Sequence, residues 1–315
     1  MPDGILNLDK PRGLTSHDVV IRVRVLTGVR RVGHAGTLDP LATGVLLLCI
    51  GQATRVSEYL MTGRKTYRAR VRLGITTDTY DIEGQVLAEA PVEVSRAQVE
   101  AALTHFRGQI DQVPPMVSAL KHRGTPLHRL ARQGVEVERA PRPVEFFRLE
   151  LTRWEPPECT LEMVCSPGTY VRALAHDLGQ MLGCGACVAG LTRLASGDFC
   201  LEDAITLEEL TQAVEENRWP DLLHPMDTAL AGRFPSLHLD ANAARRICSG
   251  QAIVDTAPAS AARRKHDERQ TANLARVYGP GGTFLAVAAY DPAGNVWRPR
   301  KVFRPWRPEL EISRS

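Results

Sequence analysis

The pattern of hydrophobic and polar positions predicts an alternation of strands and helices over roughly the first 230 residues. A helix is predicted at 16–28, where Val19, Val23 and Leu26 recur at helical spacing and Gly28 supplies a stop. Further helices are expected at 52–62, 95–108, 169–182 and 208–217. Strands are expected at 4–9, 45–50, 144–152 and 160–165. This mixture indicates an α+β protein.

Residues 65–74 alternate strictly between small or aromatic side chains and arginines. Successive side chains of a strand point to opposite faces of a sheet. One face then holds Tyr67, Ala69 and Val71, and the other holds Arg68, Arg70 and Arg72. We therefore predict a strand with one apolar and one basic side.

Two stretches lack a clean periodic pattern and interrupt the predicted elements. Residues 112–134 are rich in proline, glycine and basic residues, a composition more typical of a functional arm than of core. Residues 218–227 contain two prolines and predict a linker.

The pattern of predicted elements changes from residue 234 onward. Short strand signals broken by glycine over 274–303 predict a small β-barrel. The segment 255–273 is polar and rich in charge, so we expect a mobile loop there. The chain should therefore contain two domains, 1–230 and 234–315.

The composition is that of an ordinary globular protein, with 43% hydrophobic and 24% charged residues. The N-terminus lacks an export signal, and the longest apolar run, 45–50, is too short to cross a bilayer. The seven cysteines are irregularly spaced, and Cys184 and Cys187 form a CxxC pair with no further zinc ligands at motif spacing. We expect a cytoplasmic protein with reduced thiols.

The net charge of +3 is unevenly distributed. It amounts to +7 over 1–72, −10 over 73–233 and +6 over 234–315. Two basic ends suit a protein that touches a polyanion at both ends, although surface charge also segregates without such a partner.

The stretch GHAGTLDPLATG at 33–44 carries chemical groups without any periodic pattern. It combines the imidazole of His34 with the carboxylate of Asp39 among three glycines, and Pro40 stiffens the chain beside the carboxylate. The chain has no GxxxxGK[ST] phosphate loop, and HxxxxD offers two metal ligands at most. Asp39 is therefore the candidate reactive group, best suited to act as a nucleophile, unless it only caps a turn.

Extended to residue 55, this stretch resembles the signature segment of the bacterial TruB family of tRNA pseudouridine synthases. Further blocks resemble the family in the same order: NLDKPRG (7–13), TYRARVRLGITTDTYD (66–81), QVPPMVSALKHRG (112–124), SPGTYVRALAHDLG (166–179) and LTRLASG (191–197). The tail 234–303 resembles the PUA RNA-binding domain. The resemblance implies a mixed, mostly antiparallel sheet flanked by helices, an RNA-binding arm at about 107–135 and a PUA-like C-terminal barrel.

The resemblance also implies an isomerase that converts uridine 55 of the tRNA T loop to pseudouridine without a cofactor or metal. Asp39 matches the family's nucleophile. A paired base cannot reach a buried carboxylate, so the nucleotide should be flipped out, and His34 matches the histidine that fills its place. The expected partner is the T arm of tRNA, with no membrane and no obligatory protein partner, and we expect a monomer.

Four further residues match the family's substrate-binding positions. Arg172 would keep Asp39 ionised, because a nearby cation favours the charged form of a carboxylate. Tyr67 would stack on the target base and help remove its C5 proton. Tyr170 and Leu191 would line the uracil pocket, although Tyr67 and Leu191 also fit plain core positions.

Other residues of these motifs are expected to serve the fold. Lys10 and Pro11 match the family's first motif and should pack and position the site. The remaining aspartates of the motifs are interpreted as solvated or capping residues: Asp9, Asp78 and Asp81. His128 stands where the family has a tyrosine in the arm, and a histidine stacks less well on RNA.

Two other functions fit parts of the sequence. A non-catalytic RNA-binding or tRNA-folding module would keep all its activity after Asp39→Asn. A phosphoaspartyl transferase would use Asp39 as its acceptor, but the sequence shows no second nearby aspartate to hold magnesium.

Overall fold

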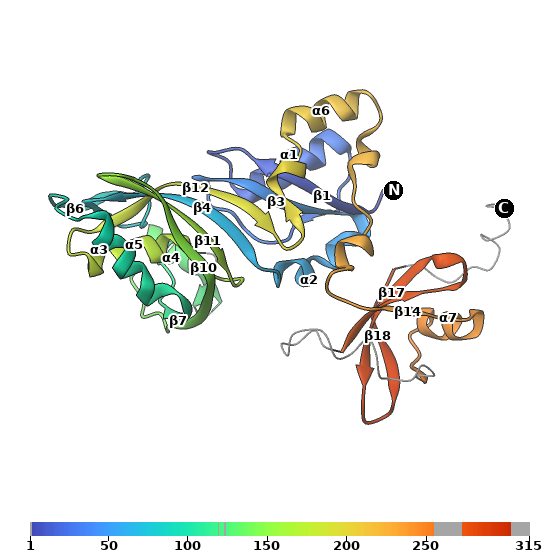
Figure 1. Cartoon of the computed structure of the whole chain (residues 1–315). Helices are drawn as coiled ribbons and strands as arrows, with labels where there is room; N and C mark the ends of the chain where they lie inside the picture. The colour runs from blue at the N-terminus through green and yellow to red at the C-terminus, as the bar shows by residue number, and fades with distance from the viewer. Residues whose placement is uncertain (1, 119, 123, 255–272, 304–315) are drawn as a thin grey trace. The chain divides into compact units, whose positions relative to one another are not determined.

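The computed structural model describes residues 2–118, 120–122, 124–254 and 273–303, without the side chains of Lys121 and His128. The chain divides into two compact units (Figure 1). The first, here called the tail unit, comprises Met1–Leu6, Cys49–Tyr59 and Pro220–Ser315. The second, here called the sheet unit, comprises Asn7–Leu48 and Leu60–Trp219.

The larger of the sheets has nine strands. They are β1 (Gly4–Lys10), β2 (Val32–His34), β3 (Ala42–Ile50), β4 (Lys65–Leu73), β7 (Gly108–Gln112), β10 (Arg142–Glu155), β11 (Glu158–Cys165), β12 (Ala186–Ser196) and β13 (Phe199–Cys200). The main path runs β1-β3-β12-β4-β11-β10-β7, with β2 beside β3 and β13 beside β12. β12 runs parallel to β3, whereas β4, β11, β10 and β7 each run antiparallel to the strand before them in the path. The expected mixed, mostly antiparallel sheet is confirmed.

Two short ribbons accompany this sheet. They are β5 (Ile75–Thr77) with β6 (Val86–Glu89), and β8 (Lys121–His122) with β9 (Thr125–Pro126). The second ribbon and helix α4 (Leu127–Arg132) lie within the arm predicted from its lack of periodicity. Apart from residues 119 and 123, which lie outside the described ranges, the arm therefore contains only short regular elements.

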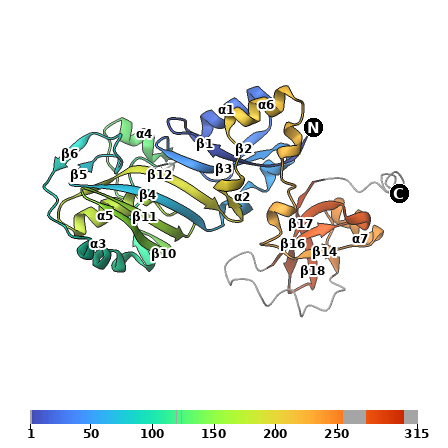
Figure 2. The same ribbon diagram turned by 45° about the horizontal axis from the view of Figure 1, so that its top comes forward.

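The other helices are α1 (Ser16–Thr27), α2 (Ser57–Met61), α3 (Arg96–Leu103), α5 (Val171–Met181), α6 (Leu207–Glu215) and α7 (Ala241–Cys248). Single-turn 3₁₀ helices occupy Gly51–Arg55, Thr104–Phe106, Leu201–Asp203, Trp219–Leu222, Thr228–Leu230 and Pro280–Gly282. α5 packs on β12 and β4, α3 packs on β10, and α1 and α6 lie side by side (Figure 2). The predicted helices are confirmed, except that the one expected at 52–62 begins as a 3₁₀ turn and that at 95–108 ends earlier.

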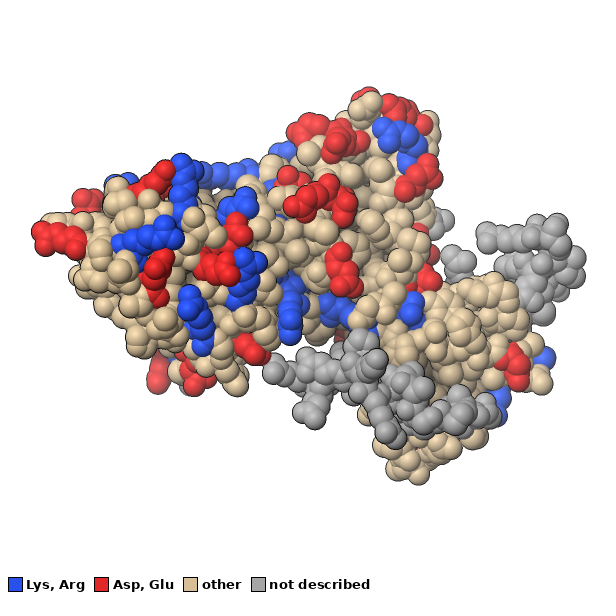
Figure 3. Space-filling view, viewed as in Figure 1, with Lys and Arg blue, Asp and Glu red and all other residues tan. Residues whose placement is uncertain are grey.

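The alternation predicted for β4 is confirmed, but its basic side is not a free positive surface. Tyr67, like the other apolar residues of the strand, is buried. On the opposite face, Arg68 pairs with Glu162 at 2.8 Å and Arg70 with Glu158 at 3.3 Å, both from the neighbouring β11. Figure 3 shows positive and negative side chains intermixed over this part of the sheet unit. The arginines are therefore neutralised across the strands.

The central strand β12 lies where the hydrophobic pattern predicted none. It pairs with β4 on one side and β3 on the other, and its first four residues are buried. A strand buried on both faces has no alternation to reveal it, and Gly190 falls at a register shift. The pattern therefore contained little signal for this element.

The segment predicted as a linker is part of the tail unit rather than a free connection. Residues Trp219–Leu222 form a 3₁₀ turn, and His224 then pairs with Ile5 through two backbone hydrogen bonds of 2.8 Å. The linker prediction is wrong because His224 in this segment satisfies its backbone groups on Ile5 of β1.

The small C-terminal β-structure expected from the glycine-broken strand signals is confirmed. Its strands are β14 (Ser236–His238), β15 (Ile253–Val254), β16 (Leu274–Tyr278), β17 (Phe284–Asp291) and β18 (Val296–Val302), in the order β14-β16-β17-β18-β15. Ile247 of α7 packs with Val277, Leu285 and Trp297 in a core of its own. The predicted loop at 255–273 lies, up to residue 272, outside the described residues.

Candidate active site

The loop between β2 and β3 carries Asp39 and is held on both sides of it. The backbone N–H of Leu38 donates to Ser16 Oγ at 2.8 Å, and that hydroxyl donates back to the Leu38 carbonyl at 3.0 Å. The carbonyl of Pro40 accepts from the Gly13 N–H at 2.8 Å. Because both neighbours are fixed, the Asp39 backbone has a defined position.

Asp39 faces a buried arginine. Arg172 Nε donates to Asp39 Oδ2 at 2.8 Å, and the Arg172 side chain is 4% exposed while that of Asp39 is 37% exposed. The other guanidinium nitrogens donate to the carbonyls of Thr79, at 2.8 Å, and Val117, at 2.9 Å. Arg172 is thus fixed from three directions, and the carboxylate it holds remains accessible.

A second carboxylate approaches the same guanidinium. Asp81 Oδ2 lies 3.7 Å from Arg172 Nη1, and Asp81 Oδ1 accepts hydrogen bonds from Thr79 and from the Glu83 N–H. Burial raises the pKa of Asp81, whereas its hydrogen bonds and the charge of Arg172 lower the pKa by a smaller amount. Asp81 does cap the turn, as one of the two interpretations held, but the other is wrong: the carboxylate is buried rather than solvated and lies 3.7 Å from Arg172. Asp9 is also partly buried and accepts from the Gly44 N–H at 3.0 Å, whereas Asp78 caps the turn at Gln85.

A cavity of about 460 Å³ opens beside Asp39. Its lining combines the loop, β4, the start of α5 and β12. Five of the six predicted site residues line it together: Asp39, Tyr67, Tyr170, Arg172 and Leu191. The sixth, His34, lies at the end of β2 and is not among the lining side chains. Burial lowers the pKa of His34, and its Nδ1 is buried without a hydrogen-bond partner among the described residues.

Two tyrosines from different elements contribute to this lining. Tyr67 is buried on β4, and this burial raises the pKa of its hydroxyl. Tyr170 caps α5, and its backbone is held by Gln112, whose side chain accepts from the Tyr170 N–H at 2.8 Å and donates to the Tyr170 carbonyl at 3.0 Å. Gln112 is 2% exposed and was not predicted from the sequence.

Arg193 is another residue of the cavity whose role is not visible in the sequence pattern. It lines the cavity from β12 at 1% exposure and donates to the carbonyls of Val45 at 2.7 Å, Thr37 at 3.2 Å and Gly36 at 3.3 Å. It lies inside the LTRLASG block, but only the leucine of that block had been assigned to the site.

Lys10 supports the loop from below. Its Nζ donates to the carbonyls of Pro11, Leu14 and Pro40 at 2.9, 2.6 and 3.4 Å. Burial lowers the pKa of Lys10 to about 8. The geometry agrees with a positioning role, as the motif suggested.

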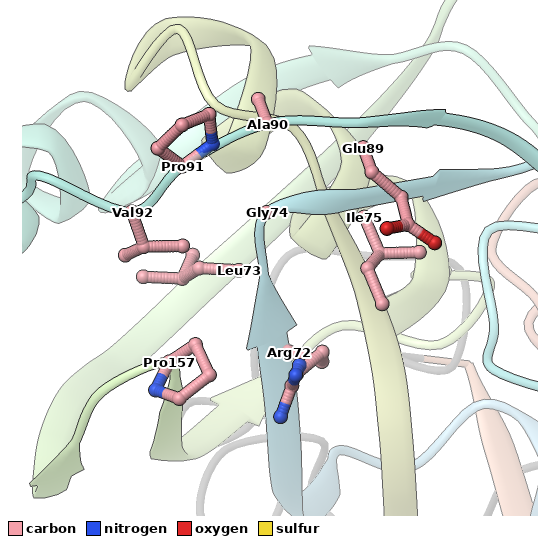
Figure 4. Close-up of a pocket in the computed structure, with 9 residues that line it drawn as sticks. All are labelled: Arg72, Leu73, Gly74, Ile75, Glu89, Ala90, Pro91, Val92 and Pro157. Atoms are coloured by element: carbon pink, nitrogen blue, oxygen red, sulfur yellow. The ribbon is translucent and has the colours of Figure 1, made fainter.

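A second hollow, of about 480 Å³, lies at the other end of β4 (Figure 4). Leu73, Val92 and Pro157 gather there around the turn at Gly74. Its lining contains a single carboxylate, Glu89, and no aromatic ring, so it offers less chemistry than the cavity at Asp39. Across the described ranges, no group of three or more His, Cys, Asp or Glu residues could hold a metal ion, and the CxxC cysteines are free and buried.

An accessible carboxylate, a fixed cation and an aromatic side chain share one cavity, an arrangement that suits covalent catalysis on a planar ligand. The sequence matches the TruB family pseudouridylate synthase N-terminal domain over 24–171. Two C-terminal domains of TruB proteins match over 172–231 and 235–303. The chain belongs to the TruB family of pseudouridine synthases. The loop with Asp39, β4 and Tyr170 fall within the first of these matches, and Arg172 and β12 fall within the second.

The similarity to members of the TruB family extends over nearly the whole chain. The tRNA pseudouridine synthase B of Syntrophotalea carbinolica is 48% identical over 92% of this chain and 93% of its own length. That of Pseudomonas aeruginosa is 45% identical over 96% of both. Among solved structures, a chain in a Cbf5-Nop10-Gar1 complex superposes with a TM-score of 0.72 at 25% identity, covering 96% of this chain and 85% of the other. The pseudouridine synthase fold expected from the sequence is thereby confirmed. Within the described ranges, no helix is long and apolar enough to span a membrane.

Proposed function

We propose that this protein isomerises uridine 55 to pseudouridine in the T loop of tRNA, with Asp39 as the nucleophile. The observation that supports this most directly is the Asp39 carboxylate, open to the cavity and held at 2.8 Å by the buried Arg172. Relatives of near-equal length that are named tRNA pseudouridine synthase B support tRNA as the substrate.

The reaction moves the ribose bond of uracil from N1 to C5 within one nucleotide. Asp39 attacks the nucleoside, the N1 glycosidic bond breaks, and the base turns and rejoins through C5. Arg172 keeps the Asp39 carboxylate ionised and aimed into the cavity, because a hydrogen-bonded cation favours the charged form. Tyr67 stacks on the base, and Tyr170 and Leu191 form the walls against which it turns.

The uridine enters the cavity only after leaving its stack in the T loop. His34 lies close in sequence to Asp39 but outside the cavity lining, which suits a residue that occupies the place the nucleotide leaves. Because burial lowers its pKa, the imidazole is predominantly neutral near pH 7 and acts as a stacking ring rather than as a cation.

RNA is held by surfaces beyond the cavity. The arm at about 107–135 contributes the Val117 carbonyl to Arg172, so its position and that of the catalytic pair are linked. Residues 234–315 act as a PUA-like RNA-binding domain, consistent with their charge of +6. Affinity rests largely on phosphate contacts and falls as salt rises. The protein works as a monomer on tRNA, without a protein partner.

Position-specific detection of pseudouridine tests this function. An unmodified tRNA transcript and a transcript with cytidine at position 55 are incubated with the purified protein, and pseudouridine is mapped along each. We expect modification at position 55 of the first transcript and none in the second. Pseudouridine elsewhere in both transcripts would assign the enzyme to another uridine, and its absence from both would reject the activity.

A further inference from the structure

Arg193 places a positive charge in the floor of the cavity. It is the largest side chain with less than 2% exposure among the described residues. An arginine keeps its proton in proteins, and a buried charge is costly unless it is paired. The described ion pairs of the cavity join Arg172 to Asp39 and to Asp81, and neither includes Arg193. A cation without a carboxylate partner is thus maintained beside the reacting groups.

The hydrogen bonds of Arg193 leave part of its donor capacity free. A guanidinium has five N–H donors, and the carbonyls of Gly36, Thr37 and Val45 accept from its three nitrogens. Arg193 and Tyr67 line the cavity together. β4 and β12 are paired here with Tyr67 directly opposite Arg193, so their proximity is built into the sheet register.

Burial and charge act on Tyr67 in opposite directions. Burial is the largest influence and raises the pKa of the Tyr67 hydroxyl, whereas the positive charge of Arg193 lowers it. The Asp39 carboxylate also raises the pKa, so Arg193 is the positive group that opposes both effects. Negative charge on this oxygen would be unfavourable without it.

We propose that Arg193 is a positioning residue that stabilises negative charge on the Tyr67 oxygen while this oxygen takes the C5 proton of the target base. The inference rests on the proposed function. After C5 has joined the ribose, the C5–H bond breaks and its electron pair becomes the C5=C6 double bond of pseudouridine. The electrons of the N1=C6 bond return to N1, which takes up a proton. The Tyr67 phenol first releases its own proton to solvent, and the resulting phenolate takes the C5 proton and becomes neutral again.

A double-mutant cycle tests this coupling. Single-turnover rates of pseudouridine formation, with enzyme in excess over tRNA, are measured for the parent chain, Arg193→Lys, Tyr67→Phe and the double variant. We expect Arg193→Lys to lower the rate by about 10²-fold, the scale of a general-base contribution. In the Tyr67→Phe background, Arg193→Lys should lower the rate less than about threefold, because the phenolic oxygen that Arg193 stabilises is absent. Arg70→Lys, on the exposed face of the neighbouring strand, is the matched control.

The outcomes separate this inference from a purely structural role. An equal loss from Arg193→Lys in both backgrounds would overturn the inference, because Arg193 would then act through the loop carbonyls alone. If Arg193→Lys does not fold by circular dichroism, 3-fluorotyrosine at position 67 leaves Arg193 in place and makes the phenol more acidic. The single-turnover rate of the fluorinated protein is compared with that of the parent on tRNA that carries deuterium at C5 of the target uridine. Equal rates for the two proteins would also overturn the inference. A parent chain without pseudouridine activity would instead reject the proposed function.

Discussion

The Arg172 guanidinium and the Asp39 carboxylate lie 133 residues apart in the sequence and meet at 2.8 Å at the edge of the cavity. The contact is asymmetric, because the arginine is buried and held by two further carbonyl groups while the carboxylate is accessible. The buried partner therefore fixes the geometry, and the exposed partner remains free to react.

Arg172→Lys should separate geometry from charge. Lysine keeps the positive charge but cannot reach Asp39 and the carbonyls of Thr79 and Val117 from one planar group. We expect the single-turnover rate to fall by about 10²- to 10³-fold, with the affinity for tRNA little changed. Filter binding and a single-turnover assay measure the two effects, and Arg68→Lys on the exposed face of β4 is the control. An unchanged rate would show that charge alone is sufficient.

Gln112 is expected to matter although it touches no reacting atom. Gln112→Leu keeps the size of the side chain but leaves the backbone N–H of Tyr170 unpaired and removes one of the two hydrogen bonds to its carbonyl, which still accepts from the Leu174 N–H. Because the residue is buried, the variant should lose about 1–3 kcal/mol of unfolding free energy and bind tRNA more weakly. Gln109 is an exposed position on the same strand, so Gln109→Leu should change neither the unfolding free energy nor the affinity for tRNA. Urea unfolding and filter binding measure the two quantities. If Gln112→Leu and Gln109→Leu have the same stability and the same affinity for tRNA, Gln112 does not position Tyr170.

Gly44 is predicted to tolerate no side chain. Its φ of +97° is unfavourable for any L-residue, and a Cβ there would run into the carbonyl of Arg193. Gly13 has a φ of +87° with nothing within 4 Å, so Gly13→Ala measures the conformational cost alone. In urea unfolding we expect about 1 kcal/mol of destabilisation for Gly13→Ala and more than about 2 kcal/mol for Gly44→Ala. Equal losses would mean that β3 and β12 are less tightly apposed than described.

Lys10 should make stability rise with pH above neutrality. Its pKa is lowered to about 8 in the folded protein, from 10.5 when unperturbed, so between these values the unfolded state binds the extra proton. The unfolding free energy of the parent relative to Lys10→Met should therefore grow from pH 8 to pH 10.5 by about 1–3 kcal/mol. Denaturation in urea at several pH values gives this difference. A difference that is constant or shrinks with pH would contradict the burial of a charged ammonium.

The sequence predicts those features that depend on neighbouring residues. The capping of α1 at Gly28 and the alternation around Tyr67 follow from local pattern, and both are found as expected. β12 was missed because it is buried between two strands and has no alternation. The neutralisation of Arg68 by Glu162 was missed because the two residues are 94 positions apart.

In the candidate site, too, the sequence reveals what depends on neighbouring residues and not what depends on distant ones. The loop with Asp39 is visible as a motif, but its pairing with Arg172 followed only from family resemblance, since no local pattern links the two positions. Arg193 and Gln112 were missed because their roles depend on backbone carbonyls and N–H groups brought together by the sheet. Such partners leave no trace in side-chain composition.

Asp39→Asn is the most direct test of the central claim, because it removes the charge and nucleophilicity of one oxygen pair while keeping its shape. Unmodified tRNA is incubated in EDTA with the parent chain, with Asp39→Asn and with Asp198→Asn, an exposed aspartate in the turn after β12. We expect pseudouridine at position 55 from the parent and from Asp198→Asn, and none from Asp39→Asn although it still binds tRNA. Equal pseudouridine from all three proteins would contradict the assignment of Asp39 as the nucleophile.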